Sequence, residues 1–213
     1  MSSMESNHIA DYFVVIGSPL DVLEPLPEHD QPITTRNPMK LAYVARILDR
    51  FPLEDRPDVS LPTGLTLFCL PDGLHVHSSP KSPSFFSFVQ TSESGAQLIG
   101  CCLTFFEELS GIQRKCFNAL IDNDESTADV SSAAMSHMKL YIPKCLCLLS
   151  RWPFVSSFKK FLCHLYRLSL TPCIIPIERY VCNFLGIWGQ LLSLSMPIIE
   201  LTHCYLCHCS LHR

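Results

Sequence analysis

The sequence predicts an α+β fold in which an antiparallel sheet is flanked by helices. Of the 213 residues, 47% are hydrophobic and 17% are charged. This composition allows a sizeable core and excludes disordered and fibrous classes. Short aromatic and β-branched runs follow one another between Gly- and Pro-containing turns, which is typical of a meander of strands. Segments with helical spacing do not alternate regularly with these runs, so a doubly wound α/β fold is not expected.

The strands are predicted from apolar runs that end at turn residues. The first run, IADYFVVIG at 9–17, is almost continuously apolar, so it is expected in the centre of the sheet. A long run at 97–109 is expected to bend at Gly100. The predicted strands are residues 9–17, 65–70, 74–77, 85–91, 97–109 and 140–149.

Three segments have the i, i+3, i+4 spacing of amphipathic helices. Residues 41–51 (LAYVARILDRF) are predicted to form a short helix that Pro52 ends. Residues 154–168 place a phenylalanine and leucine stripe on one face and Lys159, Lys160 and Arg167 off it. Residues 177–185 are predicted to form a second short helix.

Aromatic residues in the strands are interpreted as packing residues. Asp11, Tyr12 and Phe13 open the first strand, where core packing and a strand-end cap are expected. The same interpretation applies to the phenylalanines at positions 85, 86, 88, 105 and 106.

Charge divides the chain into two parts. Residues 1–138 carry 8 Lys/Arg and 18 Asp/Glu (−10), and residues 139–213 carry 8 Lys/Arg and 2 Asp/Glu (+6). This asymmetry indicates a change of structural unit near residue 139. The polar, acidic stretch before it is predicted to be a linker at 111–138. The net charge of −4 gives no reason to expect a nucleic-acid partner.

The twelve cysteines are interpreted as reduced thiols, several of them small buried apolar residues in a reducing compartment. The sequence offers two candidates for a metal site, and the ligand pattern of each is weak. His75 and His77 share a strand face near Cys69, but four ligands are needed. In the C-terminal tail, Cys204 and Cys207 have zinc-knuckle spacing, but no matching second pair lies about a dozen residues away. Further potential ligands close to this pair are His203, His208, Cys209 and His212. Upstream, the candidates are Cys173 and Cys182. No metal, cofactor or catalytic residue is predicted.

Four segments, in this order, resemble the upstream module of DENN-domain proteins. They are ADYFVVIG, RFPLEDRPDVSLPTGLTLFCLPDGLHVH, FFSFVQTSESGAQLIGCCLTFFEEL and YIPKCLCLLSRWPFVSSFKKFLCHLY, and the resemblance covers about residues 9–170. It implies a longin-like sheet flanked by helices, followed by a central α/β module of which only the start is expected here. The implied division is a disordered N-terminus at 1–8, the upstream module at 9–110, the linker at 111–138, the start of the central module at 139–183 and an unassigned Cys/His-rich tail at 184–213.

The resemblance also implies a function. Modules of this family act as guanine-nucleotide exchange factors for Rab GTPases in membrane trafficking. They use protein–protein contact, which needs no acid, base or nucleophile. Contact is expected at the sheet's edge and at residues 41–51. The expected location is the cytoplasm, with peripheral association with vesicle or endosomal membranes left open. The oligomeric state and the particular Rab are not predicted.

Two alternatives stay open. One is an inactive, binding-only fragment, because exchange activity in this family is shared with the central module. The other is a small membrane-associated protein anchored by its C-terminal tail, since residues 180–199 are twenty residues without a charge. Four lysines could meet acidic lipid or an acidic partner, or could simply form a solvated surface: Lys139, Lys144, Lys159 and Lys160.

Overall fold

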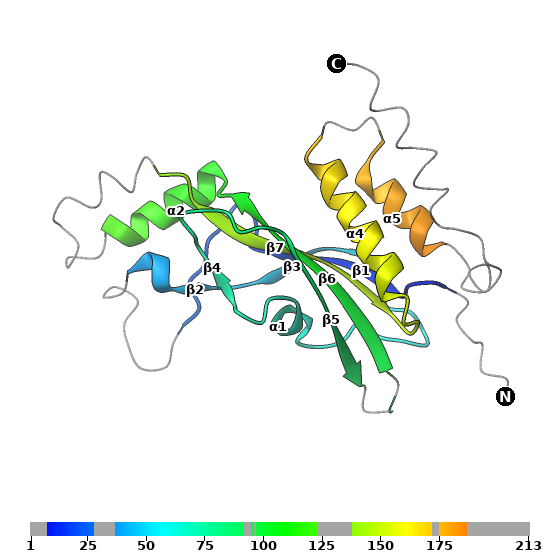
Figure 1. The fold of residues 1–213 in the computed structure, drawn as a ribbon. Coiled ribbons are helices and arrows are strands. Elements are labelled where there is room, and N and C mark those ends of the chain that lie inside the picture. The colour runs from blue at the N-terminus through cyan, green and yellow to red at the C-terminus, as the bar shows by residue number, and fades with distance from the viewer. Residues whose placement is uncertain are drawn as a thin grey trace, which may run out of the picture.

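The computed structural model describes residues 8–27, 37–91, 95, 97–122, 138–171 and 175–186. Its main sheet has five strands in the order β3-β1-β7-β6-β5, and every neighbouring pair is antiparallel. The strands are β1 (Tyr12–Gly17), β3 (Arg46–Phe51), β5 (Ser84–Thr91), β6 (Gln97–Glu108) and β7 (Tyr141–Ser150). The predicted antiparallel sheet flanked by helices is therefore confirmed (Figure 1).

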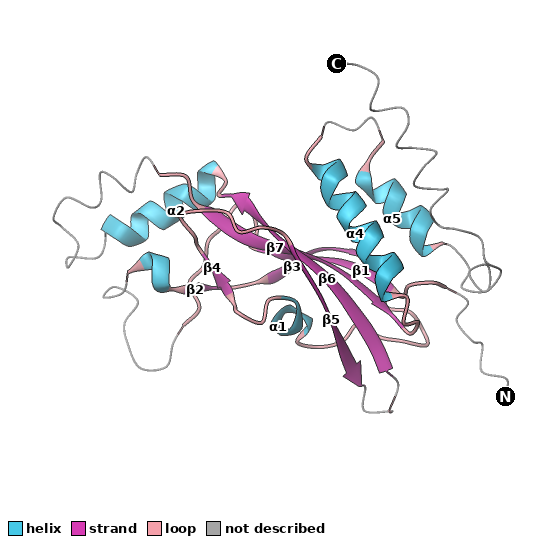
Figure 2. Ribbon diagram, in the orientation of Figure 1, coloured by secondary structure: helices cyan, strands magenta, loops and turns pink. Residues whose placement is uncertain are grey.

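Smaller elements complete the fold (Figure 2). A separate two-stranded sheet pairs β2 with β4, and a 3-10 turn, η2, precedes it. Among the described residues, two helices follow β7 along the chain and two others precede it. The bounds are β2 (Ala42–Tyr43), β4 (Leu74–His75), η2 (Pro38–Lys40), α1 (Leu65–Cys69), α2 (Gly111–Asp122), α4 (Val155–Ser169) and α5 (Ile177–Leu185).

Each face of the main sheet buries a core of its own. Helices α4 and α5 lie together over one face, where Phe158, Leu162 and Leu165 pack on alternate strand residues. The other face is covered by α1, α2 and the β2–β4 pair, with Phe117 and Leu65 among the residues that reach its core. Since both faces are covered, the central strands carry few polar residues. This explains the nearly continuous apolarity of β1 and β7.

Strand β7 lies in the middle of the sheet, between β1 and β6. Along its length Cys147 pairs with Val14 on one side and with Cys102 on the other. Residues 139–183 are predicted to begin the central module, and their strand β7 pairs with β1 and β6 from the residues before 110. The described residues on both sides of residue 139 therefore share one sheet.

The helix predicted at 41–51 is wrong. This segment forms β2 and then β3, which pairs with β1 from Phe13↔Phe51 to Gly17↔Arg46. Its apolar residues fit the helical template by chance. Pairing with a neighbouring strand satisfies the backbone of β3, and such tertiary contacts override local helical spacing.

The strand predicted at 65–70 is also wrong, because this segment contains the short helix α1. Leu65 and Cys69 are four residues apart, so both face the core, while Leu67 and Phe68 between them are exposed. Gly64, which precedes the helix, has a φ of 71°. That left-handed conformation favours glycine and turns the chain into the helix.

The linker predicted at 111–138 is corrected over its first part. Residues Gly111–Asp122 form α2, and Gln113, Phe117 and Ile121 are buried at i, i+4 spacing. Residues 123–137 lie outside the described part of the chain, as do residues 1–7 and the tail from 187 onwards. The other predicted strands and the two C-terminal helices are confirmed within a few residues at their ends.

Gly100, where a bend was predicted, lies directly opposite Phe88 of β5. A β-carbon built on Gly100 would be 2.2 Å from Cζ of that ring. The ring of Phe88 in turn stacks on Phe68 of α1, with ring centroids 5.2 Å apart. Glycine is therefore required here by the close approach of an aromatic ring.

Candidate protein-binding surface

Strand β3 is an outer strand of the five-stranded sheet. It pairs with β1 on one side, and within the described residues no strand pairs with its other side. Ile47 is 39% exposed on this strand, although it is a large hydrophobic residue. Arg46 and Asp49 beside it are exposed and charged. The edge thus combines an accessible apolar side chain with charges of both signs, which suits contact with a folded protein.

Two features protect this edge from indiscriminate strand pairing. The register between β1 and β3 shifts between Val15 and Ile16, which leaves Leu48 as an extra residue in a bulge. Charged side chains also line the edge. A partner would therefore meet side chains rather than a regular row of free backbone groups.

Ion pairs fix the two ends of β3. At its start Arg46 bonds to Glu24 at 2.7 Å, and both side chains are about half exposed. Near its end Arg50 bonds to Asp55, and its guanidinium lies 5.4 Å from the centroid of the Tyr12 ring. The side-chain hydrogen bond from Arg50 lowers the pKa of Asp55. These contacts hold the strand and the loop after it in one arrangement.

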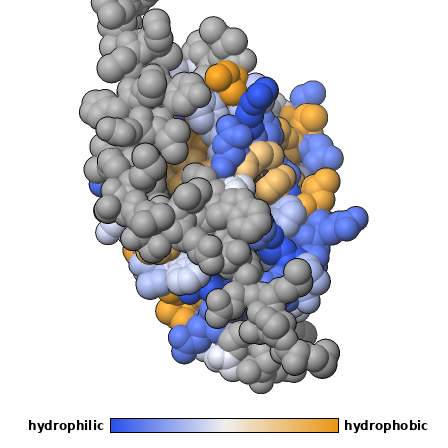
Figure 3. Space-filling model, turned by 90° about the vertical axis from the view of Figure 1, so that its right-hand side faces the viewer, coloured by the Kyte–Doolittle hydropathy of each residue, from blue (hydrophilic) through white to orange (hydrophobic). Residues whose placement is uncertain are grey.

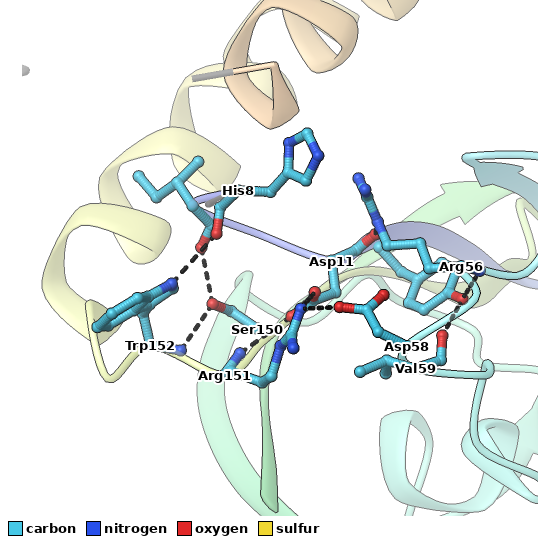
Figure 4. Close-up of polar contacts among 10 residues, drawn as sticks. His8, Asp11, Arg56, Asp58, Val59, Ser150, Arg151 and Trp152 are labelled. Carbon is cyan, nitrogen blue, oxygen red and sulfur yellow. Dashed lines mark hydrogen bonds and ion pairs between the residues drawn. The ribbon is translucent and has the colours of Figure 1, made fainter. Parts of the chain in front are cut away.

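A polar junction lies beside the same loop (Figure 4). Arg151, which follows β7, donates to Asp11 Oδ1 and to Asp58 Oδ2, both at 2.8 Å. Asp11 is 1% exposed, whereas Arg151 and Asp58 are about one-third exposed. Burial alone would lower the pKa of Arg151, but the hydrogen bonds to Asp11 and Asp58 outweigh it and raise that pKa. The buried carboxylate is therefore compensated by a charged partner.

Further hydrogen bonds tie the chain around this junction. Ser150 Oγ donates to the carbonyl of Ile9 at 2.7 Å and accepts from the backbone of Trp152 at 2.9 Å. The Tyr12 hydroxyl accepts from the backbone of Arg56 at 2.7 Å. Three distant segments are thereby joined: the start of β1, the loop after β3 and the turn between β7 and α4. This junction positions the loop that borders the β3 edge.

The sequence interpretation of Asp11, Tyr12 and Phe13 is consistent with the structure, since all three are buried. It missed the partner of Asp11, because Arg151 is 140 residues away in the chain. The signal available in the sequence was an arginine directly after a buried strand. Of the five phenylalanines expected to pack on the sheet, Phe105 is buried and the other four are partly buried: Phe85, Phe86, Phe88 and Phe106.

The histidines considered for a metal do not join Cys69. His75 Nδ1 lies 2.9 Å from the carbonyl oxygen of Leu41, and His77 makes an edge contact with the ring of Phe106. Burial lowers the pKa of His77, with a further contribution from Lys81. Cys69 instead lies against Cys102.

The four lysines considered as a basic surface are divided by the structure. Lys139 and Lys144 form ion pairs with Glu108 and Glu107 of β6. On α4, Lys159 lies 5.4 Å from the centroid of the Phe85 ring, and Lys160 is exposed. Figure 3 views the molecule from the side of these C-terminal helices and shows hydrophilic and hydrophobic residues interspersed on the part that is described.

An open groove of about 320 Å³ lies between β5 and α4, with Tyr166 and Arg167 among its lining residues. It lies beside β5, the edge strand at the other end of the sheet from β3. Among the tail candidates only Cys182 is described, and it is exposed on α5. The other tail residues and Cys173 lie outside the described part. No helix among the described residues is both long and apolar enough to cross a membrane.

Comparison with protein families gives two matches. The uDENN domain matches residues 45–105, which run from the start of β3 to near the end of β6. The DENN (AEX-3) domain matches residues 141–188, which begin with β7. Together the matches cover about half of the chain, and the boundary between them falls inside the single sheet. No solved structure matches the chain.

Proposed function

Since the chain is a DENN-domain protein with both a uDENN and a DENN match, we propose that it is a guanine-nucleotide exchange module, or the binding part of one, for a Rab-family GTPase. DENN domains are in general exchange modules for Rab GTPases. The two matches, at 45–105 and 141–188, carry the proposal. Membrane trafficking, and action in the cytoplasm or peripherally at vesicle or endosomal membranes, are parts of the same proposal.

The proposed mechanism is differential binding of two states of the GTPase. An exchange factor accelerates nucleotide release by binding the nucleotide-free or open state more tightly than the nucleotide-bound state. By linkage, nucleotide must weaken the complex by the same factor by which the module weakens nucleotide binding. Such a mechanism needs a shaped surface and no chemical step by the module.

The β3 edge is our candidate for that surface. It presents Ile47 between Arg46 and Asp49, with a bulge along the strand and an ion pair at each end. From the sequence, contact was expected both at the edge of the sheet and at residues 41–51. Residues 46–51 are themselves an edge strand, so the two expectations refer to the same surface.

Binding and exchange can be tested separately with a panel of Rab GTPases. The full chain is added to each GTPase loaded with fluorescent GDP, and nucleotide release is followed over time. Capture of nucleotide-free GTPase is measured in parallel. We expect the chain to capture at least one Rab, and we expect excess GTP to reverse this capture. Capture with faster release supports an exchange module, and capture without faster release supports the binding-only alternative. Failure to capture any Rab contradicts the proposal.

A matched pair of substitutions tests the surface. Ile47→Lys places a charge at the centre of the β3 edge, and we expect it to weaken capture by at least about tenfold, the effect of losing a well-packed interface residue. Val89→Lys is the control, because Val89 is 57% exposed on β5 at the opposite edge of the sheet. Equal loss of capture in the two variants, or loss only with Val89→Lys, would rule out the β3 edge.

A further inference from the structure

Four cysteines gather on one face of the sheet, outside the proposed docking edge. Cys102 of β6 lies directly opposite Cys147 of β7, and Cys145 is two residues earlier on the same face of β7. Cys69 of α1 packs over them, with its sulfur 3.5 Å from that of Cys102. The sulfur atoms of Cys69, Cys102 and Cys147 all lie within 4.8 Å of one another.

These thiols are sealed inside the core. All four side chains are fully buried, and their neighbours are the apolar residues that fill this face of the sheet. The 3.5 Å separation of the two nearest sulfurs is far longer than a disulfide bond of about 2.05 Å. The cluster is thus a set of free thiols that converge on one point from three parts of the chain.

The spacing of three of the sulfurs suits the ligands of a tetrahedral metal centre. With zinc–sulfur bonds of about 2.3 Å, tetrahedral geometry places ligand sulfurs roughly 3.8 Å apart. Cys69 and Cys102 are already near that separation, and all pairs in the group of three are below 4.8 Å. Cys145 lies outside this group of three, and its side chain would have to turn toward the other sulfurs to act as a fourth ligand. Its sulfur lies 3.6 Å from the carbonyl oxygen of Leu146.

We propose that Cys69, Cys102 and Cys147, with Cys145 as the fourth ligand, form a structural site for Zn²⁺ or a similar thiophilic d¹⁰ ion. Binding replaces the four thiol protons, which leave to solvent, by one divalent cation held between four thiolates. Such an ion would join α1 to β6 and β7. The site would therefore be structural, and this inference does not depend on the proposed function.

The pH determines how much metal the cluster can hold, because the thiolate rather than the thiol is the metal ligand. Because protons compete for the sulfurs, metal affinity should fall steeply as the pH falls.

Metal content of the purified full chain tests the proposal. The affinity tag is removed, no chelator is used, and metals are measured by mass spectrometry. We expect about one zinc ion per chain. Cobalt-loaded protein should show the near-ultraviolet charge-transfer band of thiolate ligands. A zinc-selective chelator should lower the melting temperature of the chain.

Three variants locate the ion. Cys102→Ser should lower the bound metal roughly tenfold, in line with loss of a ligand. Cys101→Ser is the matched control, because Cys101 is equally buried but belongs to the core on the opposite face of the sheet. Cys204→Ser/Cys207→Ser removes the other candidate pair, in the tail. Metal-free wild-type protein with no cobalt band would overturn the proposal, as would metal retained in Cys102→Ser but lost in the tail variant.

Discussion

Replacing Arg151 with leucine is expected to lower the free energy of unfolding by about 3–5 kcal/mol, the usual effect of breaking a buried ion pair from one side. Asp11 is 1% exposed and would lose the guanidinium that compensates it in the buried site. The same substitution removes the bond to Asp58 and loosens the loop after β3. Urea denaturation of the two proteins, followed by far-ultraviolet circular dichroism, measures the difference.

Two controls separate the buried charge from a general loss of packing. Asp58→Asn should cost less than about 1 kcal/mol, because a partly exposed ion pair contributes little. Adding Asp11→Asn to the leucine variant should recover part of the lost stability, since it removes the uncompensated charge. A leucine variant as stable as the original chain, or a double variant less stable than the single one, would contradict this assignment.

The second large effect is expected for Phe117→Ala, at about 3–5 kcal/mol of unfolding free energy. Phe117 is fully buried. It anchors α2 to the core on the face of the sheet that α4 and α5 do not cover. Its removal deletes a large side chain and leaves a cavity. The same denaturation experiment measures the loss.

Ile112→Ala is the matched control within α2. Ile112 is 52% exposed on the same helix, so the substitution should change stability by less than about 0.5 kcal/mol. If residues 111–122 were only a linker, both variants would be as stable as the original chain. That result would contradict the packing of α2 described here.

The sequence was most informative where burial alone decides the local structure. The strands at 97–108 and 141–150 are long apolar runs between clear turns. In α4 the apolar residues form one stripe, and the lysines lie outside it. These elements could be predicted because the pattern and the tertiary environment agree. The family resemblance, read from the same segments, anticipated the antiparallel sheet with its helices.

The errors arose where tertiary contacts decide. Residues 41–51 have helical spacing, yet pairing with β1 makes 46–51 an edge strand. Residues 111–122 were grouped with an acidic stretch, although Gln113, Phe117 and Ile121 have the spacing of a buried helical face. The position of β7 inside the sheet also depends on pairing across the whole chain, which periodicity does not encode.

The candidate surfaces were less predictable than the fold. An edge strand is a strand that has a hydrogen-bonded neighbour on one side only, and the topology of the sheet decides which strand that is. The Arg151–Asp11 pair and the convergence of Cys69, Cys102 and Cys147 both join residues far apart in the chain. A cluster of this kind has no local spacing motif, so the cysteines were interpreted only as small core residues.

Hydrogen–deuterium exchange of the full chain, with and without the nucleotide-free Rab that it captures, tests the central claim most directly. The account predicts that exchange slows in peptides covering β3 at 46–51 and the bordering loop at 52–61. Peptides from β5 and α1, near the opposite edge, should be unchanged. Protection confined to β5 or to the groove beside α4, with β3 exchanging as in the free chain, would contradict it.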